Sequence, residues 1–176
     1  MGYLKKICMY YCISMSNAYL LIGGNTGDRT GYLLQARTLI QERLGYLTKA
    51  SGIYETAAWG NTNQDDFLNQ VVGVETNLSC EGLMAEILNI EEDMGRVRTE
   101  KNAPRIIEID ILFYNDEIIN EPHLHIPHPE IQNRRFVLIP LAEIAPDFIH
   151  PVFKSSVNTL LSECKDPLDV RLFKEQ

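Results

Sequence analysis

The stretch Ile106-Ile-Glu-Ile-Asp-Ile-Leu-Phe-Tyr114 combines a long apolar run with two carboxylates one residue apart. β-Branched and aromatic residues without Gly or Pro favour a strand here. Side chains two residues apart in a strand share a face. The side chains predicted to face a core are those of Ile107, Ile109, Ile111 and Phe113. Glu108 and Asp110 are predicted on the opposite face, with Cα atoms roughly 7 Å apart.

Two carboxylates on one strand face repel each other, so positive groups are expected close by. Three arginines precede the strand, namely Arg96, Arg98 and Arg105. Arginine forms bidentate hydrogen bonds to phosphate oxygens and stays charged, and carboxylates without His or Cys prefer hard cations. The pattern predicts Glu108 and Asp110 as ligands of Mg²⁺ held against phosphate groups. The alternatives are a solvated strand face and surface ion pairs between the arginines and the acids at 91–93.

The composition is that of a soluble globular domain: 176 residues, 45% hydrophobic and 23% charged. The net charge of −8 argues against a general nucleic-acid binder, which usually carries a basic face. The four cysteines match no zinc spacing and are interpreted as reduced thiols of a cytoplasmic protein. A monomer without membrane association is expected.

Residues 1–16 are expected to form a leader outside the domain. Lys5-Lys6 followed by apolar residues faintly resembles a signal peptide, but the apolar part is short and polar-interrupted and has no small-residue cleavage site. It is also too short to span a bilayer. The leader is interpreted as disordered, or as the product of an upstream start codon with Met15 as the effective start. Residues 17–176 are predicted to form a single domain.

Periodicity and turn signals predict the order β-α-β-β-α-β. The segments are strand 18–22, a helix capped by Thr30 and ending at Gly45, extended 48–55, strand 67–75, a helix capped by Ser79 and ending at Gly95, strand 106–114, a short strand 117–119, a strand or helix start at 136–139, and helical spacing over 155–164. This order predicts an α+β, ferredoxin-like βαββαβ sandwich with C-terminal additions. Its helices are expected on one face of the sheet, which leaves the other face for a ligand.

Three further patterns bear on function. The glycine-rich Gly23–Gly27 is interpreted as a turn, because a phosphate-binding P-loop needs Lys-Ser/Thr after its last glycine. The segment His123–His128 holds three histidines but no Cys or carboxylate at ligand spacing, so zinc is disfavoured and His128 is kept as a phosphate contact. Phe67 and Phe136 are either core residues or a pair that stacks on a flat heterocycle, with Asn69 reading its edge.

Several separated motifs, in order, carry a family resemblance. They are YLLIGGNTGDR, DFLNQVV, EEDMGRVR, PRIIEIDILFYNDEII and IPHPEIQNRRFVLIPLAEIAP. From about Ala18 to Ile149 the chain resembles the 6-hydroxymethyl-7,8-dihydropterin pyrophosphokinase family of folate biosynthesis. The resemblance implies that the pterin hydroxymethyl oxygen attacks the β-phosphorus of ATP and that AMP leaves.

The resemblance also assigns roles to residues. It implies two Mg²⁺ ions on Glu108 and Asp110, which with Arg96 and Arg105 would form the catalytic set. The positions that match the ATP side are Glu91, Arg96, Arg98, Arg105, Ile111, His128 and Arg134. The pterin is expected between Phe67 and Phe136, with Asn69 and the backbone near Thr56 and Ala57 reading its polar edge.

The chain departs from the family pattern at two places. The family usually has Asp where this chain has Glu108, and the extra methylene moves the carboxylate by about 1.5 Å. The loop Thr99–Ala103 lacks the Arg-Trp pair that is frequent in the family; Lys101 would retain a cation, and Trp59 would cover the pterin instead. Two rival functions are a catalytically weakened nucleotide- or pterin-binding module and a metal-dependent phosphohydrolase.

Overall fold

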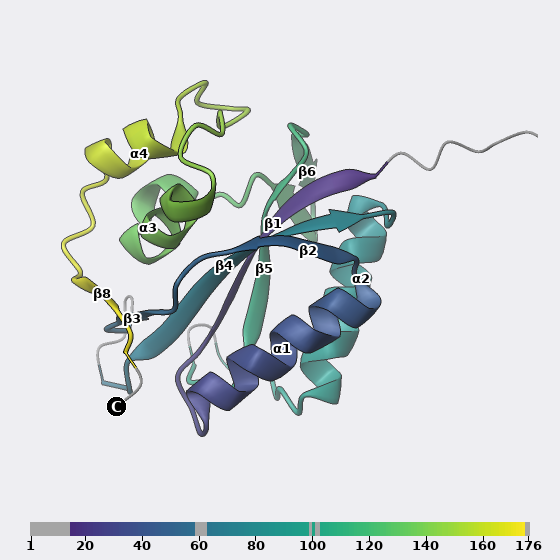
Figure 1. The fold of residues 1–176 in the computed structure, drawn as a ribbon, viewed down its shortest axis with the longest axis vertical. Helices are drawn as coiled ribbons and strands as arrows, with labels where there is room; N and C mark the ends of the chain where they lie inside the picture. The colour runs from purple at the N-terminus through teal and green to yellow at the C-terminus, as the bar shows by residue number, and fades with distance from the viewer. Residues whose placement is uncertain (1–14, 59–62, 99, 101–102, 175–176) are drawn as a thin grey trace, which may run out of the picture.

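An antiparallel sheet forms the centre of the molecule (Figure 1). The computed structural model describes residues 15–58, 63–98, 100 and 103–174. Strand β1 (Ser16–Gly24) pairs with β4 (Phe67–Thr76) on one side and with β5 (Glu108–Tyr114) on the other. The sheet order is β5-β1-β4-β3-β8, and β2 pairs with β4 beside β3. The remaining strands are β2 (Tyr46–Ala50), β3 (Tyr54–Thr56) and β8 (Val170–Leu172).

Helices α1 (Arg29–Arg43) and α2 (Cys80–Asp93) cover one face of the sheet (Figure 1). The predicted cap Ser79 is confirmed, since its side chain accepts a hydrogen bond from the Gly82 N–H at 3.1 Å. The prediction of Thr30 as the cap of α1 is wrong. Asp28 caps α1 instead, because its carboxylate accepts from the Gly31 N–H at 3.0 Å.

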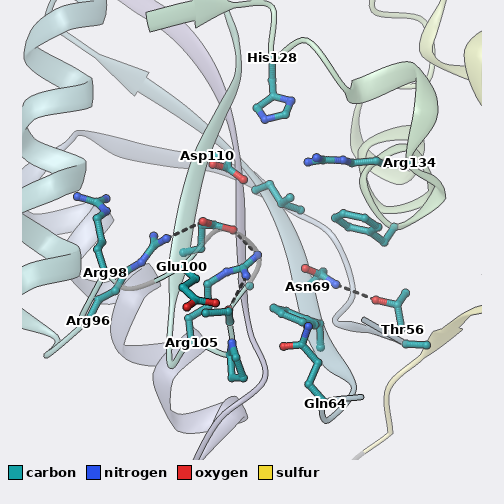
Figure 2. Close-up of a pocket in the computed structure, with 18 of the residues that line it drawn as sticks. Thr56, Gln64, Asn69, Arg96, Arg98, Glu100, Arg105, Asp110, His128 and Arg134 are labelled. Atoms are coloured by element: carbon teal, nitrogen blue, oxygen red, sulfur yellow. Dashed lines mark hydrogen bonds and ion pairs between the residues drawn. The ribbon is translucent and has the colours of Figure 1, made fainter. Parts of the chain in front are cut away.

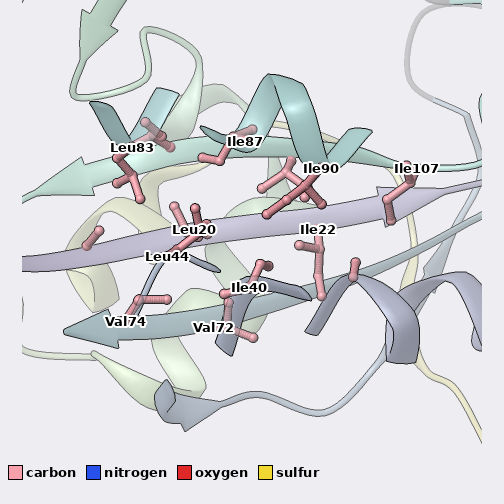
Figure 3. Packing of buried hydrophobic residues seen from close by; sticks show 14 of the residues in the cluster. Leu20, Ile22, Ile40, Leu44, Val72, Val74, Leu83, Ile87, Ile90 and Ile107 are labelled. Atoms are coloured by element: carbon pink, nitrogen blue, oxygen red, sulfur yellow. The ribbon is translucent and has the colours of Figure 1, made fainter. Parts of the chain in front are cut away.

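The larger hydrophobic core lies between these two helices and the sheet (Figure 3). Alternate residues of β1, such as Leu20 and Ile22, point into it and are fully buried. The residues that join them from the helices and the other strands include Ile40, Leu44, Val72, Val74, Leu83, Ile87, Ile90 and Ile107. This α+β arrangement confirms the predicted ferredoxin-like sandwich.

The opposite face of the sheet is only partly open, which corrects the expectation of a free ligand-binding face. Helices α3 (Arg135–Ile144) and α4 (Val157–Glu163) lie on that side (Figure 1). A second core, which includes Val71, Leu112 and Leu141, holds α3 against the sheet. The part of the face beyond the start of α3 remains available for a ligand.

A β-bulge in β5 overturns the prediction for Phe113. The register pairs Tyr19 with Phe113 but Leu20 with Ile111, so one extra residue, Leu112, interrupts the alternation. As a result Ile109 and Ile111 enter the core under α1 and α2, whereas Phe113 enters the core under α3. Glu108 and Asp110 precede the bulge and keep the predicted orientation, away from the isoleucines.

The segments around and after β5 differ from the prediction in detail. The short strand expected at 117–119 is β6 (Ile119–Glu121), which forms a separate hairpin with β7 (Leu124–Ile126). A 3₁₀ turn (Ile131–Asn133) leads into α3, which resolves the ambiguous segment 136–139 as helix. Residues 1–14 of the expected leader lie outside the described residues. No helix in the described ranges is both long and apolar enough to cross a bilayer.

Candidate active site

A cavity of about 360 Å³ opens on the uncovered part of the sheet, on the same side as α3 (Figure 2). Its floor comes from β1, β4 and β5, and its walls come from the segment before β5, the end of β3 and the start of α3. One end is ionic and the other is aromatic and amide-lined. Twelve of the predicted site residues line it: Thr56, Ala57, Phe67, Asn69, Arg96, Arg98, Arg105, Glu108, Asp110, His128, Arg134 and Phe136.

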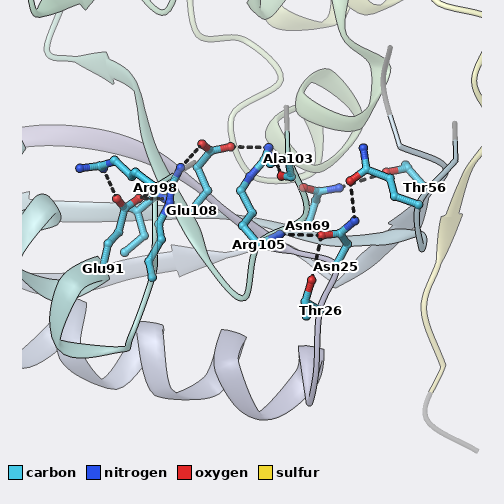
Figure 4. Close-up of polar contacts among 12 residues, drawn as sticks. Asn25, Thr26, Thr56, Asn69, Glu91, Arg98, Ala103, Arg105 and Glu108 are labelled. Atoms are coloured by element: carbon cyan, nitrogen blue, oxygen red, sulfur yellow. Dashed lines mark hydrogen bonds and ion pairs between the residues drawn. The ribbon is translucent and has the colours of Figure 1, made fainter. Parts of the chain in front are cut away.

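Glu108 is held between two arginines at the ionic end (Figure 4). Arg96 donates to its Oε1 at 2.6 Å, and an Arg105 Nη2 lies 2.5 Å from its Oε2. The longer glutamate side chain therefore bridges both guanidinium groups at once. The positive partners expected for the paired acids are present, and they engage Glu108 directly.

Asp110 occupies the wall beside Glu108. Burial, together with the nearby carboxylates of Glu108 and Glu91, raises the pKa of Asp110 to about 7, against the opposing charges of Arg134 and Arg105. Its carboxylate is thus poorly compensated by the protein itself. A cation bound between the two acids would relieve that repulsion.

Glu91 lies behind the arginines and does not line the cavity. Only 2% exposed, it accepts from Arg96 at 2.5 Å, from the Ile109 N–H at 2.7 Å, and from Arg98. Burial raises the pKa of Glu91, and these three donors oppose the shift. Its role in this geometry is to orient two arginines, because they lie between it and the cavity.

Arg105 joins the ionic end to the aromatic end. Its guanidinium carbon lies 4.7 Å from the centre of the Phe67 ring, and its Nη1 donates to the Ala103 carbonyl at 3.0 Å. The Arg105 N–H donates to Asn25 Oδ1 at 2.9 Å, and the Asn25 N–H donates to the Arg105 carbonyl, also at 2.9 Å. Asn25 therefore fixes the approach to β5 on the end of β1.

His128 is a neutral hydrogen-bond donor toward the cavity. Burial, together with the charge of Arg134, lowers the pKa of His128 to about 4. The Glu130 N–H lies 3.2 Å from His128 Nδ1, which must act as acceptor, so the proton resides on Nε2. His125 is exposed and pairs with Asn120, so these two histidines do not meet at a shared metal site.

The aromatic end is built around a buried amide. Asn69, 4% exposed, donates from Nδ2 to the Thr56 hydroxyl at 3.1 Å. A Cβ on Gly23 would lie 2.4 Å from Asn69 Oδ1, so glycine is required beneath the amide. Phe67 and Phe136 both line this end, and the Arg134 guanidinium carbon lies 5.8 Å from the Phe136 ring centre.

Two predicted contacts are not brought to the cavity as side chains. Ile111 points into the core under α1 and α2 and is 2% exposed, so only its backbone could meet a nucleotide. Trp59 and Lys101 lie outside the described residues. Sequence reasoning missed Gln64 and Glu100, which line the cavity; both lie in polar loops next to predicted site residues, and no motif marked them.

The donor set fits Mg²⁺ held jointly with a substrate. Glu108 and Asp110 offer hard oxygen ligands on one strand face, and the charge of Glu108 adds to the effect of burial in raising the pKa of Asp110. Among the described residues, no group of three or more His, Cys, Asp or Glu side chains is placed to bind a metal. The remaining ligands would therefore be phosphate oxygens and water, which is the usual situation for Mg²⁺.

The chain is similar in sequence to known proteins. Residues 19–146 match the family model of 7,8-dihydro-6-hydroxymethylpterin-pyrophosphokinase. The 2-amino-4-hydroxy-6-hydroxymethyldihydropteridine pyrophosphokinase of Aquifex aeolicus is 40% identical over 149 residues, which is 85% of this chain and 92% of the relative. Its counterpart in Methylorubrum extorquens is 42% identical over 136 residues, covering 77% and 86%.

Longer proteins also contain the fold. The wild-type HPPK-DHPS of Plasmodium falciparum, crystallised with pteroate, superposes with a TM-score of 0.70 at 18% identity. The match covers 85% of this chain but 42% of that one, so it supports the fold of one part of a larger protein. With motifs, cavity and full-length relatives in agreement, the chain belongs to the 7,8-dihydro-6-hydroxymethylpterin-pyrophosphokinase family.

Proposed function

We propose that this chain transfers the pyrophosphoryl group of ATP to the hydroxymethyl oxygen of 6-hydroxymethyl-7,8-dihydropterin, with release of AMP, in folate biosynthesis. The names of its full-length relatives support this activity. The observation that carries the proposal is the cavity itself, which joins paired acids and arginines to an aromatic, amide-lined end. One reactant is polyanionic and the other is a flat, polar heterocycle, so the two ends are complementary to them.

The ionic end would bind the triphosphate. Glu108 and Asp110 would hold two Mg²⁺ ions, which would neutralise phosphate charge and lower the pKa of the attacking hydroxyl. Arg96 and Arg105 now bind Glu108, and they would exchange this carboxylate for phosphate oxygens when ATP enters. Catalysis would rest on positioning and on charge stabilisation as AMP departs.

Neighbouring residues would set the geometry of the phosphates. Glu91 keeps Arg96 and Arg98 oriented, because both guanidinium groups are hydrogen-bonded to its buried carboxylate. His128 would donate from Nε2–H to a phosphate oxygen while remaining neutral at pH 7, since its pKa is about 4. Arg134 would supply a further positive charge from the opposite wall (Figure 2).

The aromatic end would bind the pterin. Phe67 and Phe136 would stack on its two faces, since flat heterocycles pack favourably against aromatic rings. Asn69 has its Nδ2 engaged by Thr56, so its Oδ1 would accept hydrogen bonds from the pterin edge. The backbone of Thr56 and Ala57 lies at the same end and would complete the recognition. The proposal includes a monomer, acting in the cytoplasm.

An assay of AMP release tests the proposal. Purified protein with ATP, Mg²⁺ and the hydroxymethyl dihydropterin should release AMP and not ADP, and only when the pterin is present. Asp110→Ala should lose nearly all turnover while it stays folded, whereas the control Asp116→Ala, in the turn after β5, should retain the wild-type rate.

Each rival predicts a different outcome of that assay. ATP loss without pterin would indicate a phosphohydrolase. Binding of ATP or pterin by calorimetry without AMP release would indicate a weakened binding module. Near-wild-type turnover of Asp110→Ala would refute the proposed metal ligand.

A further inference from the structure

We infer that Asp166 is a positioning residue for the pterin, because it fixes the start of α3, which carries Phe136, relative to β3, which carries Thr56. The inference rests on the proposed function for the identity of the ligand. Asp166 and β8 lie beyond residues 19–146, the part matched by the family model. No motif in the sequence marked them.

The start of α3 lacks a cap of its own. The first backbone N–H groups of a helix have no partner within the helix, and a side chain normally accepts from them. Arg134 occupies the N-cap position and makes no side-chain capping hydrogen bond. Asp166, 9% exposed, supplies the cap from a distant part of the chain, since its Oδ2 accepts from the Arg135 N–H at 3.0 Å.

The same carboxylate also shapes the tail that follows it. Asp166 Oδ1 accepts from the Leu168 N–H at 3.1 Å, and the chain then enters β8. Strand β8 pairs antiparallel with β3, with Val170 opposite Thr56, and the Phe173 N–H donates to the Ile53 carbonyl at 2.8 Å. In Figure 1 the tail runs from α4 past α3 to β8 at the edge of the sheet.

A second link ties the far end of α3 to the same strand. Glu143 accepts from the Gly52 N–H at 3.0 Å and from the Tyr54 hydroxyl at 2.9 Å. The helix is thus attached to β3 near its end by Glu143 and, through the tail, at its start by Asp166. Phe136 and Thr56 both line the cavity, so the tail links the two elements that carry them.

Loss of the Asp166 carboxylate should weaken pterin binding selectively. Removal of a cap frays the first helical turn, which here contains Phe136, and caps are commonly worth a factor of about three to ten in the local equilibrium. Asp166→Ala should raise the KM for the pterin by about that factor and the KM for ATP by less, because Arg134, on the ATP side, also lies at this helix start. Asp166→Asn should fall between Ala and wild type, because its single oxygen can serve only one of the two amides.

The test combines steady-state AMP release with calorimetric titration of the pterin in the presence of a non-hydrolysable ATP analogue. The control is Asp169→Ala on the same tail, whose side chain is 82% exposed; it should behave as wild type. Hydrogen exchange at the Arg135 and Phe136 amides supplies a readout that needs no turnover, and it should speed up in Asp166→Ala alone.

The outcomes separate this inference from the proposed function. Unchanged pterin affinity and KM in Asp166→Ala, with a lowered melting temperature, would reduce Asp166 to a structural residue and overturn the inference. Equal losses for ATP and pterin would also overturn it. A wild-type protein that bound no pterin would instead overturn the proposed function, and the pterin role of Asp166 with it.

Discussion

Replacement of Glu91 by Gln offers a sharp test of the ion network behind the site. The side-chain exposures are 3% for Glu91 and 12% for Arg96, so the pair is largely shielded from water. The glutamine amide keeps the shape but removes the charge, and it turns one acceptor into a donor that faces a guanidinium group. Breaking a buried ion pair while one charge remains typically costs about 3–5 kcal/mol.

A control of the same chemistry lies on the same helix. Glu86 pairs with Arg43 at 2.5 Å, as Glu91 pairs with Arg96, but both side chains of the control pair are 28% exposed. Exposed pairs of this kind contribute little to stability, so Glu86→Gln should change the stability little.

Urea denaturation measures the difference between the two variants. With a denaturant slope of about 2 kcal/mol per molar, a loss of about 3–5 kcal/mol lowers the midpoint of Glu91→Gln by roughly 1.5–2.5 M. Glu86→Gln should lower it by less than about 0.5 M. If the two variants unfold within about 0.5 M of each other, the Glu91 network does not carry the stability assigned to it here.

Three further predictions concern the two acids of β5 and the backbone packed against the start of that strand. In Glu108→Asp the side chain is shorter by about 1.5 Å and cannot bind Arg96 and Arg105 at the same time. The KM for ATP should therefore fall, and the rate of AMP release should be unchanged or raised. Complete loss of activity would contradict this site geometry. The pKa of Asp110 is about 7 in the folded chain against 3.8 for an ordinary aspartate, so the folded state binds the proton more tightly and wild-type stability should fall as pH rises from about 4 to about 7. In thermal melts, the stability of Asp110→Asn relative to wild type should therefore be greater at pH 8 than at pH 5. If the difference in melting temperature between variant and wild type is the same at both pH values, Asp110 is not a buried charge. Gly24→Ala would place a Cβ 2.2 Å from the Ile106 carbonyl oxygen and should lower the free energy of unfolding by about 1–3 kcal/mol. In the control Gly82→Ala the nearest atom to the new Cβ is at 3.4 Å, so this variant should not be destabilised. Equal effects of the two substitutions on the free energy of unfolding would refute the steric argument.

The sequence predicted the ionic half of the site because its parts are close in sequence. Glu108 and Asp110 are one residue apart, and Arg105 lies only three residues before Glu108, so strand alternation and proximity sufficed. Alternation also placed Ile111 on the core face, as observed, whereas the family resemblance had assigned it to the nucleotide side. Local periodicity is reliable where one strand supplies the whole pattern.

The features that the sequence did not reveal are long-range or break the alternation. The bulge at Leu112 leaves an uninterrupted apolar run, so Phe113 could not be assigned to its true face. The cover provided by α3 depends on packing between distant segments. Asp166 caps a helix that begins 31 positions earlier, and no local signal indicates such a contact.

The bulge at Leu112 lets one strand hold two hydrophobic layers in opposite directions. Ahead of it, isoleucines anchor the sheet to α1 and α2; at and beyond it, Leu112 and Phe113 anchor α3. Glu108 and Asp110 lie on the same face of the sheet as α3. The helix that forms one wall of the cavity therefore packs on the strand that carries the two acids. A substitution that weakens the packing of α3 on β5, such as truncation of Leu141, would lower the activity at temperatures where the chain as a whole is still folded.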